Sequence, residues 1–156
     1  MSACTSTAPL RVLIVDDSAD MCASTAMLLR LWGHDAREAA DGPTALAEAA
    51  EYYPDVVLLD LGLPGMDGYE VARRLRQQMG PSQPLMVSMS GHAGTEQRRR
   101  ALEAGCNLHW IKPAEPEELC RLLESRKRAR DETDFVTDCA GASTPILDIV
   151  GPAGKL

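Results

Sequence analysis

The sequence lacks any long apolar run. None of its apolar segments approaches the ~18–20 residues that a helix needs to cross a bilayer, so we expect no membrane association. The opening stretch, MSACTSTAPLRV, has neither the basic segment nor the apolar segment of a secretion signal. Together these absences predict a cytoplasmic protein.

Paired cysteines are also missing. The five cysteines lie at positions 4, 22, 106, 120 and 139, and no two of them form a CxxC motif. Zinc ribbons and thioredoxin-type sites both require such pairs, so neither is indicated. The scattered, odd-numbered set favours reduced thiols that fill space in a core.

Positive charge is in deficit, because the net charge is −7. A protein whose main task is to bind nucleic acid or acidic lipid would carry the opposite balance, so we expect no direct nucleic-acid partner. Two basic runs, 98–100 and 126–130, are exceptions. In the first run, consecutive side chains point to different sides of a helix, and the second run falls near a helix C-terminus, where positive charge is favourable. Both runs are therefore interpreted as solvated faces or as rims of a protein-docking surface.

What the sequence does contain is a strict alternation of short apolar runs and helical patterns. Strands are predicted at residues 11–15, 35–39, 55–59, 84–90 and 107–111. Helices are predicted at about 18–32, 41–53, 68–79, 94–104 and 114–128. Five strand–helix units in this order imply right-handed crossovers and a five-stranded parallel sheet with helices on both faces, which is a doubly wound α/β fold.

Helical spacing also predicts which side chains face the core. The first helix would bury a stripe made of Met21, Thr25, Leu28, Leu29 and Trp32. The third would bury Val71, Ala72, Leu75 and Met79, and the last would bury Leu119, Leu122 and Leu123.

The periodic pattern stops at about residue 128. Residues 129–156 contain scattered Gly, Pro, Ser and Thr, and they predict a disordered or loosely docked tail that is too short for a core of its own. The expected organisation is therefore an N-terminal extension at 1–9, one domain at 10–128, and the tail.

Four predicted strands end in chemically active residues. Asp16 and Asp17 follow the first strand, Asp60 ends the third, Ser90 ends the fourth and Lys112 follows the fifth. The carboxyl ends of parallel strands meet at one edge of the sheet, so these side chains should converge there. Three carboxylates at such short range repel one another unless a cation lies among them, and oxygen ligands that leave room for a phosphate suit Mg²⁺.

The same set of residues suggests phosphoryl chemistry. A carboxylate can attack phosphorus to form an aspartyl phosphate, and the transfer needs positive charge around the phosphoryl oxygens. The metal and Lys112 would supply that charge, and the Ser90 hydroxyl could donate a hydrogen bond. No His or Cys is placed to act as the nucleophile instead.

These motifs resemble the receiver domain of two-component response regulators. The matching pieces are VLIVDDS (12–18), VVLLDLGLPGMDGYEVARRLR (56–76), VSMSGHA (87–93), ALEAGC (101–106) and WIKP (110–113), and the resemblance covers about residues 10–128. It implies a flavodoxin-like (βα)5 fold and a signalling domain whose only chemistry is Mg²⁺-dependent self-phosphorylation and autodephosphorylation.

The resemblance also implies a role for each site residue. Asp60 would be the phosphoacceptor. Asp16, Asp17, Asp60 and the backbone carbonyl of Gly62 would bind Mg²⁺, with Mn²⁺ as a substitute. Lys112 would contact the phosphoryl group with its ammonium. The peptide bond between Lys112 and Pro113 would be cis. Ser90 would be the switch hydroxyl.

Three positions depart from the usual family pattern. His109 stands where an aromatic Tyr or Phe is the usual partner switch, and an imidazole adds a pH-dependent charge. Gly62, two residues past Asp60, has no side chain to orient a water. His92, two residues past Ser90, could contact the attacking water or the phosphate.

The partners that the resemblance implies are a histidine kinase or phosphotransfer protein and a downstream protein. The downstream target would bind the surface formed by residues 94–104, 107–111 and 114–128. No output domain is expected, and the protein would be a monomer or a phosphorylation-dependent dimer.

Two other classes of function compete with this reading. A stand-alone phosphohydrolase or phosphotransferase of the haloacid-dehalogenase type would carry D-x-D at the end of its first strand, whereas this sequence has VDDSAD. A flavodoxin-like cofactor binder would need a glycine-rich phosphate loop after the first strand, and none follows it.

Overall fold

The computed structural model describes residues 9–63, 65–80, 83–91, 94–112 and 114–139, with side chains described as far as residue 129. These residues fall into two compact units, one spanning Pro9–Pro113 and the other beginning at Ala114, and each is described by itself. The predicted extension at 1–9, apart from Pro9, and the tail beyond 139 lie outside the described residues.

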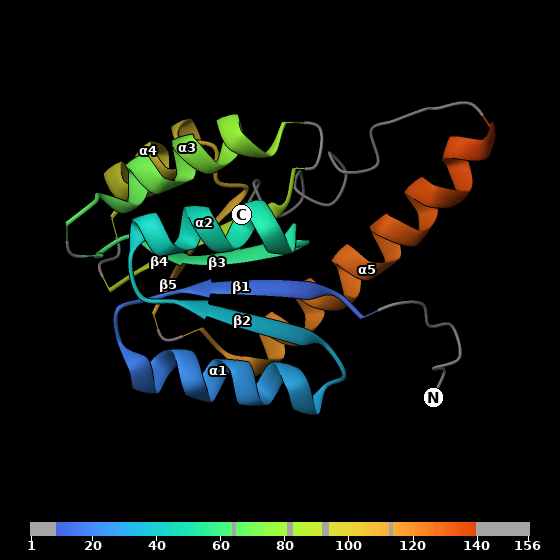
Figure 1. The fold of residues 1–156 in the computed structure, drawn as a ribbon, viewed down its shortest axis with the longest axis horizontal. Coiled ribbons are helices and arrows are strands. Elements are labelled where there is room, and N and C mark those ends of the chain that lie inside the picture. The colour runs from blue at the N-terminus through green and yellow to red at the C-terminus, as the bar shows by residue number, and fades with distance from the viewer. Residues whose placement is uncertain (1–8, 64, 81–82, 92–93, 113, 140–156) are drawn as a thin grey trace. The chain divides into compact units, whose positions relative to one another are not determined.

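The first unit is built on one parallel sheet (Figure 1). Its strands are β1 (Arg11–Val15), β2 (Asp35–Ala39), β3 (Val56–Asp60), β4 (Leu85–Ser90) and β5 (Leu108–Ile111). Their order across the sheet is β2-β1-β3-β4-β5, and every neighbouring pair is parallel. The chain thus begins at β1, turns outward to β2 and then crosses over to β3, so the strand order reverses between β1 and β3.

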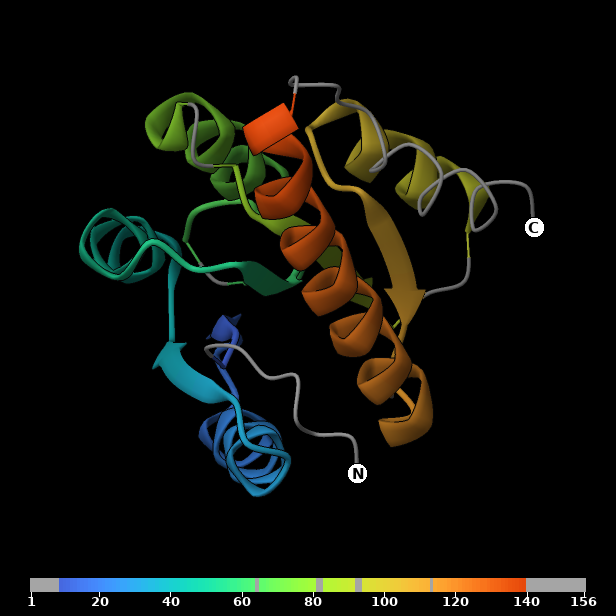
Figure 2. The same cartoon turned by 90° about the vertical axis from the view of Figure 1, so that its right-hand side faces the viewer.

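Helices cover both faces of this sheet, as predicted. They are α1 (Ala19–Leu31), α2 (Gly42–Tyr52), α3 (Gly68–Met79) and α4 (Thr95–Glu103). In Figure 1, α1 lies below the strands while α2, α3 and α4 lie above them, and Figure 2 shows the same layers from the amino-terminal edge of the sheet. The five-stranded, doubly wound α/β fold is therefore confirmed.

Local signals set the helix boundaries. The side chain of Ser18 accepts a hydrogen bond from the Met21 amide at 3.3 Å and caps α1, and Asp41 caps α2 through the Thr44 amide at 2.8 Å. Gly33, with φ of +92°, follows the end of α1.

The core lies between the sheet and helices α2 and α3. β3 and β4 are buried along their whole length, which explains why their sequences, VVLLD and LMVSMS, are mostly apolar. The predicted inward residues of α3, namely Val71, Ala72, Leu75 and Met79, are all buried there, packed with Leu13, Val57 and Met86 from the strands.

The predicted stripe on α1 was partly wrong, because only Leu29 of its five residues is fully buried. Met21 is 38% exposed, while the buried residues are Cys22, Ala26 and Leu29. Two of these three side chains are small, and α1 packs against β1 and β2. A prediction that gives most weight to large apolar residues therefore misses the buried face of α1, where two of the three buried side chains are small.

The second unit contains one long helix, α5 (Pro116–Cys139). Its predicted end near residue 128 was wrong by eleven residues. No Gly or Pro occurs between Ala129 and Cys139, and the first helix-breaking glycine is Gly141. The irregular polar composition of residues 129–139 predicted a tail. However, this stretch contains no residue that ends a helix, and α5 continues through it.

Candidate acidic site at the carboxyl edge of the sheet

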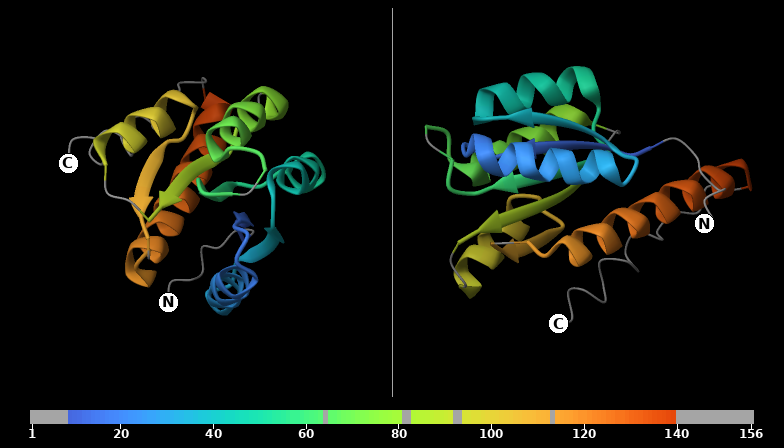
Figure 3. Two further views of the ribbon diagram at one scale, coloured as in Figure 1. Left: turned by 90° about the vertical axis from the view of Figure 1, so that its left-hand side faces the viewer. Right: turned by 90° about the horizontal axis from the view of Figure 1, so that it is seen from below.

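Asp16, Asp60, Ser90 and Lys112 lie at the carboxyl ends of four strands, at the edge of the sheet that faces the viewer in the left panel of Figure 3. Backbone hydrogen bonds carry the sheet slightly past the strand ends. The Asp16 amide donates to the Ala39 carbonyl at 3.0 Å, and the Lys112 amide donates to the Ser90 carbonyl at 2.8 Å. The residues that follow β1 and β5 are therefore held almost as firmly as those within the strands.

Three carboxylates gather at this edge. Asp16, Asp17 and Asp60 each present an oxygen within 4.8 Å of the other two. Asp16 and Asp60 are only 3% and 6% exposed, whereas Asp17 is exposed. The predicted convergence of acidic side chains from the first and third strands is confirmed by this geometry.

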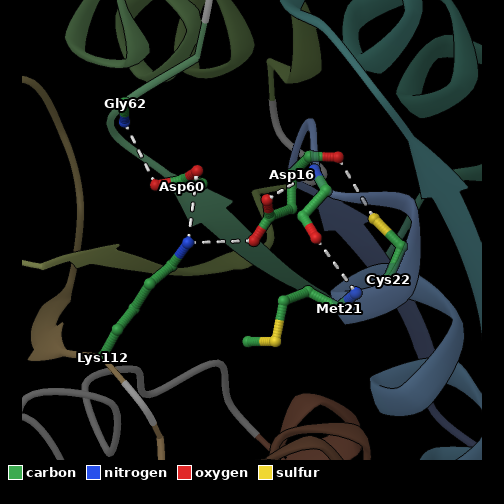
Figure 4. Close-up of polar contacts among 7 residues, drawn as sticks. Asp16, Met21, Cys22, Asp60, Gly62 and Lys112 are labelled. Atoms are coloured by element: carbon green, nitrogen blue, oxygen red, sulfur yellow. Dashed lines mark hydrogen bonds and ion pairs between the residues drawn. The ribbon is translucent and has the colours of Figure 1, made fainter.

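Lys112 reaches into the acidic cluster and lies between its two buried members (Figure 4). Its Nζ is 3.1 Å from Asp16 Oδ2 and 3.3 Å from Asp60 Oδ2. Burial by itself lowers the pKa of Lys112, but the hydrogen bond to Asp16 and the attraction of both carboxylates outweigh it, so the pKa is raised. The ammonium stays charged at neutral pH.

Asp16 is fixed by the start of α1. Its Oδ1 accepts a hydrogen bond from the Ser18 amide at 2.9 Å, and its carbonyl accepts one from the Cys22 thiol at 3.2 Å (Figure 4). Burial, followed by the nearby charge of Asp16, raises the pKa of Cys22 to about 11. This thiol therefore stays protonated and supports the site instead of reacting, a role that the sequence did not indicate.

The loop after Asp60 approaches both the site and α3. The Gly62 amide donates to Asp60 Oδ1 at 3.1 Å, and a side chain at position 62 would first meet that oxygen at 3.8 Å. A Cβ at Gly68 would lie 2.6 Å from the Leu61 Cα, so only glycine lets the loop pack on the first turn of α3. The absence of a side chain at position 62 leaves Asp60 uncovered from that direction.

The charges of this site fit a divalent cation. Three carboxylates and one ammonium leave two negative charges uncompensated within a few ångströms. All the side-chain donors are hard oxygen ligands, which suit Mg²⁺ better than softer metals. The exposed Asp17 leaves the cluster open to solvent on one side.

Ser90 and His109 meet beside this cluster. Ser90 is 8% exposed, and its Oγ lies 3.3 Å from His109 Nε2. A third residue, Ser88, was missed by the sequence analysis although it is fully buried and lies 2.8 Å from His109 Nδ1. A hydroxyl in the middle of the apolar run LMVSMS was the signal that could have found it, because a buried polar group needs a partner.

The environment of His109 predicts a pH-dependent stability. Burial, with the charge of Arg98 added, lowers its pKa from the usual 6.5. Below pH 6.5 the unfolded chain therefore takes up a proton that the folded chain does not, so stability falls as the pH drops toward the folded pKa. We expect urea unfolding at pH 7.5 and 5.5 to show a larger loss for the wild type than for His109→Phe. Equal losses of unfolding free energy in the two proteins would show that His109 is not the cause of the pH dependence.

The remaining candidates have simpler surroundings. Arg99 pairs with Glu96 at 2.6 Å and Glu103 at 2.7 Å, and Arg100 stacks over the Tyr69 ring at 4.2 Å. His92 and Pro113, and with Pro113 the expected cis bond, lie outside the described residues.

Within the described ranges, no helix has both the length and the apolarity that crossing a bilayer would require.

The strand order and the five-unit alternation define a flavodoxin-like α/β fold of the receiver class. The chain belongs to the response regulator receiver domain family, whose sequence profile matches residues 12–124. Receiver domains are signalling domains of two-component systems, and they generally bind Mg²⁺ at an acidic pocket.

Individual relatives agree with this assignment. The DNA-binding response regulator MtrA of Mycobacterium tuberculosis is 37% identical over 122 residues, which are 78% of this chain and 52% of that protein. The transcriptional regulatory protein PrrA of the same species is 38% identical over 123 residues, 79% of this chain and 52% of that protein. The chain spans about half the length of these curated relatives.

Solved structures show the same fold. The chemotaxis response regulator CheY4 of Vibrio cholerae is 28% identical with a TM-score of 0.69, covering 76% of this chain and 98% of that one. A CheY-like response regulator receiver domain protein from Methanospirillum hungatei is 26% identical with a TM-score of 0.67, covering 78% and 98%.

Proposed function

We propose that this chain is a phosphorylation-driven switch that receives a phosphoryl group on Asp60 from a histidine kinase or a phosphotransfer protein. The observation that carries the proposal is the placement of the Lys112 ammonium between Asp16 and Asp60, with Asp17 completing the acidic cluster. A buried nucleophilic carboxylate beside a fixed cation is what transfer to an aspartate requires.

In this proposal Asp16, Asp17, Asp60 and the Gly62 carbonyl hold Mg²⁺, or Mn²⁺ in its place. The bound ion would offset the negative charge of the carboxylates and of the incoming phosphoryl oxygens. Two backbone amides orient the buried carboxylates before any phosphodonor arrives. The Ser18 amide donates to Asp16 Oδ1, and the Gly62 amide donates to Asp60 Oδ1.

The transfer forms a bond between an Asp60 carboxylate oxygen and phosphorus as the bond from phosphorus to the donor breaks, and the donor leaves with that electron pair. Lys112, already 3.3 Å from Asp60 Oδ2, would stabilise the charge on the phosphoryl oxygens. The Ser90 hydroxyl would then donate to one of those oxygens, which shifts the domain toward its second conformation.

The downstream partner would bind residues 94–104, 107–111 and 114–128. On α4 and β5, Leu102 and Ile111 are 43% and 48% exposed and would offer apolar contact area to such a partner. The relative MtrA is named as a DNA-binding response regulator and is about twice as long as the matched segment, so a protein-binding output without direct nucleic-acid binding is part of this proposal.

Turnover distinguishes this function from that of a phosphohydrolase. With Mg²⁺ and acetyl phosphate we expect one acid-stable, base-labile phosphoryl group per chain, measured by intact-protein mass spectrometry. With a panel of organic phosphate monoesters we expect no multiple-turnover release of phosphate, because the proposed function is a switch that holds one phosphoryl group on Asp60. Sustained release from several monoesters would favour the enzyme instead.

A further inference from the structure

We propose that His109 is a positioning residue for the Ser90 hydroxyl. The neutral ring accepts a hydrogen bond from Ser90 through Nε2, so this hydroxyl is not available to an incoming phosphoryl group until Ser90 and His109 move apart. The proposal rests on the switch role of Ser90 in the proposed function. It follows from a chain of contacts that joins Ser90, His109, Ser88 and the Leu108 carbonyl.

The tautomer of His109 follows from counting protons along this chain. Ser88 has one hydroxyl proton, and its Oγ lies 3.2 Å from the Leu108 carbonyl oxygen, which can only accept. Ser88 also hydrogen-bonds the Cys106 thiol, whose burial raises its pKa, so this thiol keeps its proton and can donate it to the Ser88 oxygen. If Ser88 donates to the Leu108 carbonyl, its oxygen accepts the Nδ1 proton of His109 across 2.8 Å, and Nε2 is bare. The opposite tautomer leaves the Ser88 and Leu108 oxygens facing each other with no proton between them.

A bare Nε2 makes Ser90 the donor of the remaining contact. A hydroxyl has one proton, so Ser90 cannot give it to His109 and to a phosphoryl oxygen at the same time. At 3.3 Å this contact is the longest of the three and therefore the weakest. It is the contact that a phosphoryl oxygen, as a charged and stronger acceptor, would displace.

The ring itself is held by buried groups. Ser88 is fully buried in the centre of β4, and β4 and β5 are paired so that Ser88 stands opposite His109. The nearby charge that acts on the ring comes from Arg98 of α4, and together with burial it favours the neutral form. The hydrogen-bond chain therefore runs from the sheet interior to the edge where Asp60 lies.

Long-range ¹H–¹⁵N correlation spectra of the intact chain test the tautomer directly. We expect His109 to show a protonated Nδ1 and an unprotonated Nε2, its signals being assigned by their loss in His109→Phe. In Ser88→Ala the Nδ1 acceptor is gone, so the proton should move to Nε2 and point at Ser90. An Nε2-protonated ring in the wild type, or an unchanged tautomer in Ser88→Ala, would overturn the proposal.

Phosphorylation kinetics test the consequence. Removing the acceptor in His109→Phe, or reversing the tautomer in Ser88→Ala, should raise the initial rate with acetyl phosphate and Mg²⁺ by about two- to five-fold, which corresponds to one weak hydrogen bond. The two changes should not add in the double variant, because they act on the same proton. In a Ser90→Ala background neither should have any effect.

The outcomes separate this inference from the function on which it rests. If the wild type is not phosphorylated on Asp60 at all, the proposed function fails. If the wild type is phosphorylated but His109→Phe still accelerates the reaction when Ser90 is Ala, or fails to accelerate it when Ser90 is present, the positioning role of His109 is wrong and the proposed function stands.

Discussion

Replacing Asp60 with Asn should abolish stable phosphorylation. The amide that replaces the carboxylate is a poor nucleophile, and the two other acids of the cluster cannot substitute for it. Asp16 is tied to the Ser18 amide and to Lys112, while Asp17 is exposed. We expect no phosphoryl group on the variant by intact-protein mass spectrometry after incubation with acetyl phosphate and Mg²⁺.

The matched control for this change is Asp55→Asn. Asp55 lies next to the other end of β3, where its carboxylate accepts from the Arg11 amide at 2.9 Å, a contact that the Asn oxygen can keep. This variant should be phosphorylated as the wild type is. A phosphoryl group that persists in Asp60→Asn, at a rate like that of the control, would show that another residue is the acceptor.

Replacing Lys112 with Met should slow phosphorylation by about 10²–10³-fold, which is typical when one preorganised donor is lost from a site of developing charge. The Met side chain fills similar space but leaves the phosphoryl oxygens without their ammonium. Initial rates with acetyl phosphate at saturating Mg²⁺ measure this loss. A matched control is Lys127→Met on α5, which lies in the other compact unit and should leave the rate unchanged.

The same Lys112 change has a second effect, on folding. Without Mg²⁺, the buried carboxylates of Asp16 and Asp60 would face each other with no cation between them. We expect the free energy of unfolding to fall by about 1–3 kcal/mol, since an uncompensated buried charge is costly. Adding Mg²⁺ should restore part of this stability in Lys112→Met. An unfolding midpoint that does not respond to Mg²⁺ would argue against a metal site in the cluster.

Elements with strong local signals were predicted well. α3 has an apolar stripe, an Asp67 cap and a glycine at its end, and its observed bounds are the predicted ones. β3 and β4 were recognisable because strands that are buried on both faces are mostly apolar. In these segments the local sequence and the tertiary environment impose the same pattern.

Two helices show where local reasoning fails. On α1 the predicted stripe favoured large side chains, but the structure buries the small Cys22 and Ala26 together with Leu29. On α5 the mixed charged sequence after Ala129 was taken for a tail, although it contains no residue that ends a helix before Gly141. The burial on α1 depends on packing against the sheet, which a window of sequence does not contain, whereas the lack of a helix breaker after Ala129 was visible in the sequence.

The sequence by itself determined the alternation of strands and helices, and with it the edge at which Asp16, Asp17, Asp60, Ser90 and Lys112 had to meet. This follows because parallel strands with crossover helices bring all their carboxyl ends to one side. Only the tertiary structure decided the contacts between side chains that are far apart in the chain. Lys112 bridges two buried carboxylates, and Ser88 supports His109, because β4 and β5 are paired in one particular register. Register is fixed by packing of the whole sheet, and no short motif encodes it.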